Sequence, residues 1–286
     1  MPTKRQMPTI RLRRMAGELR RLRDVNGLTR EEVEERTGIN NVTLYRIEYA
    51  KVRPQRRTVM GLLDLYGVED PQRSEILALL KQADEQSWLR PYHADLTDTY
   101  TTFISFETEA RSLRNYESLF VPGLLQIEDY ARAVIKGVLP TSTTKEVEQR
   151  VQARMDRQAI LRREAPLELW TIVDEAVLRR GIGKPNVMVD QLHRMVEVAE
   201  LPNVTLQVIP FTAGPHPGML GSFVLIDFPD PADPTLSYME SMAADLFLEA
   251  EADVQRYNQS FDHLRAMALS PDDSRHLIAK VADEIN

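Results

Sequence analysis

Apolar residues spaced three and four positions apart mark the start of the chain as a series of short helices. Between Ile10 and Gly27 this spacing predicts one amphipathic helix, which the glycine ends. The same pattern predicts three further helices, over Arg30 to Thr37, Asn41 to Glu48 and Thr58 to Tyr66. Short helices of this kind bury their apolar faces against one another, so we expect a small helical bundle.

Polar residues between these helices predict how the chain turns. Thr29 and Glu32 have the T-x-x-E spacing of a capping box. Gly38 permits a sharp turn, and Asn40 is a favourable N-cap for the helix that follows. A short helix, a glycine turn and a second short helix in this order are typical of a helix-turn-helix.

Beyond about residue 82 the pattern changes. A connecting stretch with proline, threonine and aromatic residues follows, so we predict one domain over residues 1–82 and a second over residues 83–286. Helical periods in the second domain cover residues 103–117, 124–136, 145–163, 187–200, 252–269 and 272–285. Apolar, β-branched runs predict strands over residues 167–173, 205–209, 222–226 and 236–240. The expected fold is mainly α, with an α+β second domain.

Charge is unevenly distributed along the chain. The net charge is −7, but residues 1–60 hold 15 Lys and Arg against 7 Asp and Glu, while the rest holds 21 against 36. A basic head on an acidic body is expected when only one end meets phosphate. A solvated, arginine-rich helix face would give the same counts, so charge alone leaves both interpretations open.

The run LTREEVEERTGINNVTLYRIEYAKVRP resembles the DNA-binding domain of the XRE, or phage-repressor/Cro, family. The resemblance implies that the helix over Asn41 to Glu48 lies in the major groove of double-stranded DNA. It assigns base contacts to Asn40, Asn41, Val42 and Arg46. Asparagine can pair with adenine, arginine with guanine, and valine can meet a thymine methyl group. Phosphate contacts fall to Arg30, Lys51, Arg53, Arg56 and Arg57.

Two positions depart from that family. Arg30 stands where many relatives have a glutamine that bridges a phosphate and the recognition helix. An arginine can keep the phosphate contact, but whether it braces the recognition helix is left open. Ala50 stands where relatives tend to have glycine, and because a positive φ is unfavourable for alanine we expect a different helix end. The alternative for this domain is a four-helix bundle that binds protein.

Catalytic and metal-binding patterns are sparse. The chain has no cysteine, and its five histidines show no H-x-x-x-H pair. His216, in the Gly/Pro-rich loop of residues 212–218, is the histidine most suited to a function; the alternative is a turn residue bonded to backbone. Asp174 and Glu175 are expected to cap a helix rather than catalyse. We expect no metal, no cofactor and no enzymatic activity.

Arginines at 150, 154 and 157 recur at helical spacing on one face of a predicted helix. They could bind an anionic ligand or partner. A solvated face, or salt bridges to the acidic surroundings, is the interpretation that we favour.

Five motifs of the second domain resemble a group of actinomycete regulators described as WhiJ-like or antitoxin-like. They are LFVPGLLQIEDYARAV, VQARMDRQAIL, DEAVLRRGIG, PNVTLQVIPFTAGPHPGMLGSF and YMES, and the resemblance runs from about Phe103 onward. It implies a small, separately encoded BldB-like partner protein and control of development or secondary metabolism. The candidates for partner or ligand contacts are Pro122, Gly123, Arg132, Arg157, Glu175, His216 and Glu240. Fold maintenance is the alternative role for most of them.

Taken together, the sequence predicts a cytoplasmic, homodimeric transcription regulator. Its second domain would dimerise or receive a signal, either a small partner protein or a small molecule. We expect no signal peptide and no membrane span, because no apolar run is long enough. One alternative is an antitoxin-like module that sequesters its partner and binds DNA for autoregulation. An enzyme fused to a DNA-binding head would need convergent polar groups around His216 or Glu175.

Overall fold

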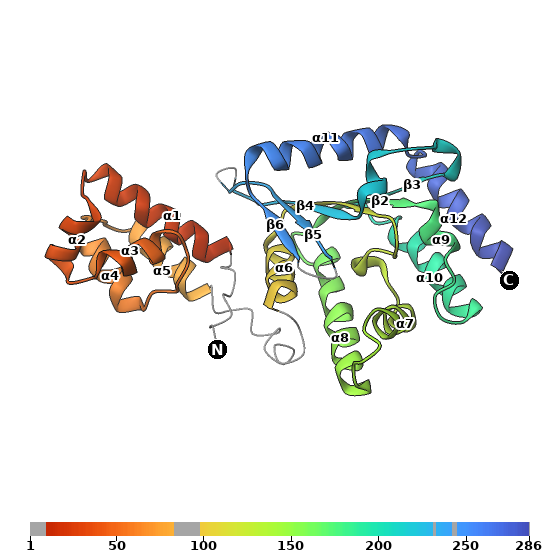
Figure 1. The fold of residues 1–286 in the computed structure, drawn as a ribbon, viewed down its shortest axis with the longest axis horizontal. Coiled ribbons are helices and arrows are strands. Elements are labelled where there is room, and N and C mark those ends of the chain that lie inside the picture. The colour runs from red at the N-terminus through yellow and green to blue at the C-terminus, as the bar shows by residue number, and fades with distance from the viewer. Residues whose placement is uncertain (1–9, 83–97, 231–232, 242–244, 286) are drawn as a thin grey trace. The chain divides into compact units, whose positions relative to one another are not determined.

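A computed structural model describes residues 10–82, 98–230, 233–241 and 245–285 (Figure 1). The chain divides into two compact units, residues 1–93 with 97–106 and residues 94–96 with 107–286. We call the helices of residues 10–82 the head and the part from Glu107 onward the body. The predicted boundary after residue 82 stays a prediction, because residues 83–97 lie outside the described residues.

Five helices build the head: α1 (Ile10–Val25), α2 (Arg30–Thr37), α3 (Asn41–Glu48), α4 (Arg56–Leu65) and α5 (Gln72–Gln82). The predictions for α1, α2 and α3 are confirmed, whereas α4 begins two residues earlier than predicted. The bundle of four helices is incomplete, because α5 was not predicted and its Ile76 and Leu80 are buried in the core. That core also takes side chains from every other helix of the head, such as Met15, Leu19, Val33, Leu44, Ile47, Val59, Leu62 and Leu63.

The predicted caps set the turn between α2 and α3. Thr29 and Glu32 form the capping box, since the Glu32 amide donates to Thr29 Oγ1 and the Thr29 amide donates to Glu32 Oε2. Gly38 has a φ of 72°, which a residue with a side chain adopts less easily. Asn40 then caps α3 by accepting a hydrogen bond from the Val42 amide. The helix-turn-helix geometry therefore follows from local sequence.

A six-stranded mixed sheet forms the centre of the body. Its strands are β1 (Ser112–Glu117), β2 (Glu168–Asp174), β3 (Val204–Ile209), β4 (Phe223–Asp227), β5 (Leu236–Met239) and β6 (Leu246–Leu248). Their order across the sheet is β3-β2-β1-β4-β5-β6. The pairs among β1, β2 and β3 are parallel, and the remaining pairs are antiparallel. The expected α+β class is confirmed.

Helices cover both faces of this sheet. Figure 1 shows α11 (Glu251–Met267) across one face and α7 (Glu128–Val138), α8 (Thr144–Arg157) and α10 (Pro185–Val198) on the other. Phe261 and Leu264 of α11 pack against buried sheet residues that include Tyr116 and Ile172. The remaining helices are α6 (Asp98–Glu109), α9 (Glu175–Arg179) and α12 (Pro271–Ile285), and α12 packs against α10 and β3.

The prediction of one helix over residues 103–117 is wrong. The helix ends at Glu109, and residues 112–117 form β1, the strand between β2 and β4. Its polar residues find partners across the sheet that local periodicity does not reveal: Asn115 accepts from Thr171 Oγ1, and Arg114 pairs with Asp227. The short elements β6 and α9 were not predicted as separate elements.

The sheet places several loops of the body at a common edge. Because β1, β2 and β3 are parallel, Glu117, Asp174 and the loop after Ile209 all lie at the edge where these strands end. Strand β4 begins at the same edge because it runs antiparallel to β1, with Tyr116 opposite Phe223. We call this edge the carboxyl edge.

Candidate nucleic-acid interface

Helix α3, the second helix of the helix-turn-helix, buries one side and exposes the other. Leu44 and Ile47 lie in the head core, while Val42 is 53% exposed and Arg46 is also exposed. Among the described residues, no hydrogen bond or ion pair engages the Arg46 guanidinium. Its donors, together with the Val42 methyl groups, are therefore available to an external partner such as a base edge.

The two asparagines at the start of α3 are held by acidic residues of α2. The Asn40 amide group donates to Glu34 Oε1 at 3.0 Å while its oxygen caps the helix. The Asn41 backbone amide donates to Glu34 Oε2 at 3.0 Å, and its side chain contacts Glu31 at 3.5 Å. Both polar atoms of the Asn40 side chain are thus engaged, the oxygen in the helix cap and the nitrogen with Glu34, whereas the Asn41 side chain makes one long contact.

A basic and aromatic cluster lies at the other end of α3. Tyr45 and Tyr49 are exposed, with ring centroids 4.6 Å apart. Lys51 donates to the Tyr45 hydroxyl at 2.7 Å, and its ammonium lies 4.3 Å from the Tyr45 ring centroid. Arg20 and Arg30 lie over the Tyr49 ring at 5.0 and 5.7 Å. Neither tyrosine was predicted as a site residue, although their spacing of four on one helix face could have identified the pair.

Glu48 ties α3 to the two preceding helices. Its buried carboxylate receives hydrogen bonds from Arg23 Nε at 2.5 Å and from Arg30 Nε at 2.8 Å. The hydrogen bond to Glu48 is the main reason why the pKa of Arg30 lies above its usual value. Arg30 therefore does brace the recognition helix, which the sequence left open.

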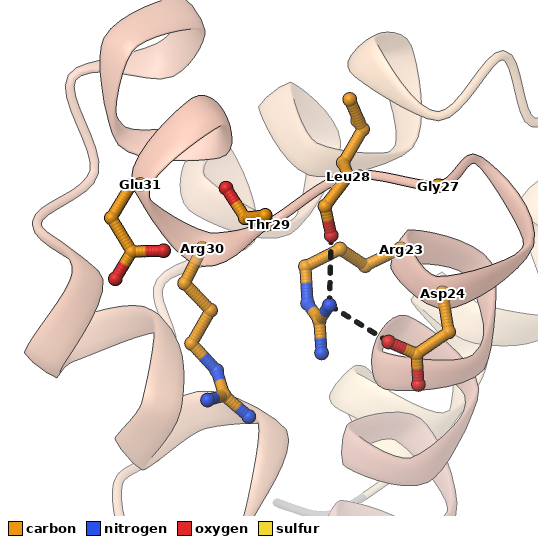
Figure 2. A pocket seen from close by; sticks show the side chains of 7 residues that line it. All are labelled: Arg23, Asp24, Gly27, Leu28, Thr29, Arg30 and Glu31. Carbon is orange, nitrogen blue, oxygen red and sulfur yellow. Dashed lines mark hydrogen bonds and ion pairs between the residues drawn. The ribbon is translucent and has the colours of Figure 1, made fainter.

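A hollow of about 430 Å³ lies beside this tie, between the end of α1 and the start of α2 (Figure 2). Arg23 lines it and bonds to the Leu28 carbonyl and to Asp24, as the dashed lines show. With its other nitrogens on Glu48, the Arg23 guanidinium is fully engaged in holding the turn together. We attribute the hollow to this structural arrangement rather than to a ligand.

The expectation of a different end for α3 is wrong. Ala50 takes a φ of 50°, in the left-handed region that glycine usually occupies. The Ala50 amide donates to the Ile47 carbonyl at 2.9 Å, and the Lys51 amide donates to the Arg46 carbonyl at 2.7 Å. These two bonds are those of a Schellman motif. The helix ends as it would with glycine, and the alanine carries the strain.

The residues predicted to contact phosphate lie in three different surroundings. Arg56 and Arg57 are exposed in the first turn of α4, whose N-cap, Gln55, makes no side-chain capping bond. Free amides and two arginines at a helix N-terminus suit an anionic group such as phosphate. Lys51 and Arg30 belong to the tyrosine cluster, and Arg53 donates to the Leu80 carbonyl at 2.8 Å.

Four of the seven candidates in the body form ion pairs within the fold or lie in a turn. Arg157 is only 4% exposed and forms a buried ion pair with Glu107 at 2.7 Å, so it is not on a solvated face. Arg132 bridges helices α7 and α8 through Glu128, Asp129 and Glu148. Pro122 and Gly123 enter the 3-10 turn η2 (Gly123–Leu125). These observations favour fold maintenance for the four.

The other three candidates lie at the carboxyl edge. Glu240 directly follows β5 and is exposed. Glu175 is buried at the start of α9, where it accepts from the Phe211 amide at 2.9 Å and pairs with Arg179. His216 Nε2 lies 3.2 Å from Asp174 Oδ2, so its partner is a carboxylate and not the backbone that we weighed as an alternative. The prediction that Asp174 caps a helix is confirmed.

Comparisons with protein families agree with the division of the chain into a head and a body. A family model described as a helix-turn-helix domain matches residues 14–76. A second model, described as a domain of unknown function (DUF5753), matches residues 100–280, which is more than half of the chain. The chain belongs to the DUF5753 family. No curated protein and no solved structure matches it.

In the DUF5753 domain the polar side chains of Tyr116 and Asp174 lie close to His216. Tyr116 is fully buried on β1, its ring centroid lies 6.0 Å from that of His216, and Gly218 packs against it. Tyr116 Oη and His216 Nδ1 are both buried with no hydrogen-bond partner among the described residues. Asp174 can fix the tautomer of His216 and leave Nδ1 as a proton acceptor, the arrangement that an enzymatic role would require.

Two further kinds of site, metal-binding clusters and membrane-spanning helices, are not found among the described residues. Over those residues no group of three histidine, aspartate or glutamate side chains is placed to hold a metal ion. None of the described helices combines the length and the apolar character that crossing a membrane requires.

Proposed function

We propose that the chain is a sequence-specific DNA-binding regulator of transcription, in which α3 enters the major groove of double-stranded DNA. One observation carries this proposal: the exposed face of α3 presents an unengaged Arg46 on a helix-turn-helix domain. Arg56 and Arg57 lie at the uncapped start of α4 in the same domain, where phosphates can be held.

Within this proposal the contacts divide by chemistry. Asn41, Val42 and Arg46 read bases, and Asn40 joins them if it exchanges its bond to Glu34 for one to a base. Lys51, Arg56 and Arg57 hold phosphates, since their side chains are exposed. Arg30 adds a phosphate contact while keeping its bond to Glu48, and Arg53 adds one by leaving the Leu80 carbonyl.

For the DUF5753 domain we propose a regulatory role. It dimerises, and it receives a small partner protein or a small-molecule signal that changes the affinity of the head for DNA. The resemblance to WhiJ-like regulators supports a BldB-like partner. Co-purification with the product of a neighbouring gene tests this, because an antitoxin-like module would form a stable complex that alters operator affinity.

Selection from a library of random DNA duplexes tests the central proposal. The full chain is incubated with the library, bound duplexes are amplified over several rounds, and the enriched sequences are compared. We expect a short motif for the wild-type chain and loss of part of that motif for Arg46→Ala. Enrichment of no sequence by a folded chain would reject sequence-specific binding.

A further inference from the structure

Two stretches of the acidic body carry no charged residue apart from one histidine. Residues 118–127 and 201–226 contain no Asp, Glu, Lys or Arg. They meet at the carboxyl edge, where the Ser118 amide donates to Ser222 Oγ at 3.1 Å. The single histidine, His216, is turned inward and pairs with Asp174. The loops that these two stretches contribute to the carboxyl edge therefore carry no Asp, Glu, Lys or Arg, whereas Glu117, Asp174 and Glu240 lie at the same edge on other segments.

Large apolar side chains are exposed on these stretches. Leu220 is 98% exposed and Met219 is 71% exposed, and both belong to the loop between β3 and β4. Phe211, from the same loop, and Leu119, from the loop after β1, are also exposed. We call these four residues the apolar edge. Large exposed apolar side chains on loops at one edge of a sheet are typical of protein interaction sites.

The loop between β3 and β4, which carries most of the apolar edge, is held in place by contacts with residues of α9 and β1. The Phe211 amide donates to Glu175, and His216 pairs with Asp174, so two consecutive residues at the start of α9 anchor it. Gly218 lies so close to Tyr116 that a methyl group at its Cα would come within 2.3 Å of the tyrosine ring. A surface fixed in this way loses little conformational entropy when a partner binds.

We propose that the apolar edge is the surface through which two copies of this chain form a two-fold symmetric dimer. In such a dimer the same patch of both copies meets, so the patch has to be compatible with itself. Residues 107–286 hold 18 Lys and Arg against 28 Asp and Glu, so two bodies carry net charge of the same sign and repel each other. Contact through uncharged apolar side chains avoids that repulsion.

The choice of a second copy as the occupant also rests on the proposed function. A recognition helix of 8 residues reads few base pairs by itself. Dimeric helix-turn-helix proteins double their site by presenting two recognition helices to two half-sites. A dimer made by the body would supply that second helix.

Sedimentation velocity on the full chain tests the proposal. We expect the wild type to be a dimer at micromolar concentration, and Met219→Asp with Leu220→Asp to raise the dimer dissociation constant at least tenfold. Val138→Asp is the matched control, because Val138 is 54% exposed on α7, outside the apolar edge, and should leave dimerisation unchanged. Thermal unfolding of each variant establishes that the body is folded.

A wild-type chain that stays monomeric up to about 100 μM overturns the proposal. So does a folded double variant that dimerises as tightly as the wild type. The proposed function fails in a different way: a dimer that enriches no DNA sequence rejects DNA recognition and leaves the interface in place. A monomer that enriches a sequence rejects the interface and leaves DNA recognition in place.

Discussion

At the scale of single residues, Gly218 is the position where one added methyl group should matter most in the body. A Cβ there would lie 2.3 Å from Tyr116 Cζ and 2.7 Å from its hydroxyl oxygen. Tyr116 is fully buried, so its ring has little room to move. We therefore expect Gly218→Ala to lower the free energy of unfolding of the body by about 1–3 kcal/mol. Urea unfolding followed by tryptophan fluorescence measures this.

Gly137→Ala is the matched control for that variant. Gly137 lies near the end of α7, and no atom comes within 4 Å of the position of an added Cβ. Because alanine favours helix more than glycine does, the free energy of unfolding of this variant should rise by up to about 1 kcal/mol. Equal effects of the two substitutions would contradict the close approach of Gly218 to Tyr116.

Glu117, at the end of β1, makes the stability of the body depend on pH. Burial raises the pKa of its carboxyl to about 7, and hydrogen bonds from Ser222 and Asn115 offset only part of that effect. In the unfolded chain the same group titrates near 4.5. Between these two values the folded state keeps a proton that the unfolded state releases, so stability falls as pH rises from 4.5 to 7 and levels off above.

We expect Glu117→Gln to remove this dependence. Relative to the variant, the wild type should lose roughly 1–3 kcal/mol of unfolding free energy between pH 5 and pH 8. Urea unfolding at both pH values measures the difference, and each protein serves as its own reference at pH 5. A wild type that gains stability over the variant as pH rises would show that the Glu117 carboxylate is stabilised in the folded state.

At the scale of elements, we expect α3 to read bases and Lys51, which follows α3, to hold a phosphate. Arg46 is unengaged on the exposed face, so Arg46→Ala should cost about 1–3 kcal/mol of binding, confined to one base position. Lys51 lies against Tyr45, so Lys51→Ala should weaken all duplexes alike and reduce the salt dependence by about one phosphate contact. Fluorescence anisotropy on the selected duplex and its single-base variants, at several salt concentrations, measures both.

The Arg46→Ala and Lys51→Ala variants should differ, because Arg46 is assigned to a base and Lys51 to a phosphate. If Arg46→Ala bound every single-base variant of the duplex with the wild-type pattern of affinities, α3 would not be reading the base assigned to Arg46. If Lys51→Ala changed the preference for one base and left the salt dependence intact, Lys51 would be a base reader instead.

The head shows how far local sequence determines an element. The bounds of α2 and α3 agree with the prediction because a capping box, a glycine and an N-cap asparagine mark their ends. Helix α5 was not predicted, although its apolar residues Ile76 and Leu80 are four apart and both are buried in the core of the head. The bracing of α3 by Arg30 depends on Glu48, which lies 18 residues away, and no local pattern reports such a pair.

In the body, the four apolar strands β2, β3, β4 and β5 were predicted, whereas the polar strand β1 and the three-residue strand β6 were not. Strands β2, β3, β4 and β5 are dominated by apolar residues, whereas β1 reads SLRNYE. Its Arg114 and Asn115 are stabilised by Asp227 and Thr171, more than 50 residues away. The pairing of His216 with Asp174 has the same origin, because the parallel strands bring the two loops to one edge. Contacts of this range depend on topology.

At the scale of the whole molecule, the separation of charge should control how the chain meets DNA. Residues 1–82 hold 17 Lys and Arg against 11 Asp and Glu, whereas residues 83–286 carry a net charge of −13. An acidic body tethered to a basic head repels the phosphates that the head attracts. This repulsion extends over a distance that shrinks from about 30 Å at 0.01 M salt to about 8 Å at 0.15 M.

The isolated head should therefore bind non-specific duplex DNA more tightly than the full chain at low salt. Residues 10–82 contain a core of their own, which makes a fragment of residues 1–82 a reasonable comparison. We expect a difference of at least threefold in dissociation constant at about 0.02 M salt, closing by about 0.3 M as the charges of the body are screened. As a control, a neutral osmolyte replaces the added salt, because an osmolyte leaves the screening of charge unchanged. A difference that persists at high salt would point to occlusion of α3 by the body rather than to repulsion, and equal affinities at low salt would mean that the negative charge of the body does not reach the DNA.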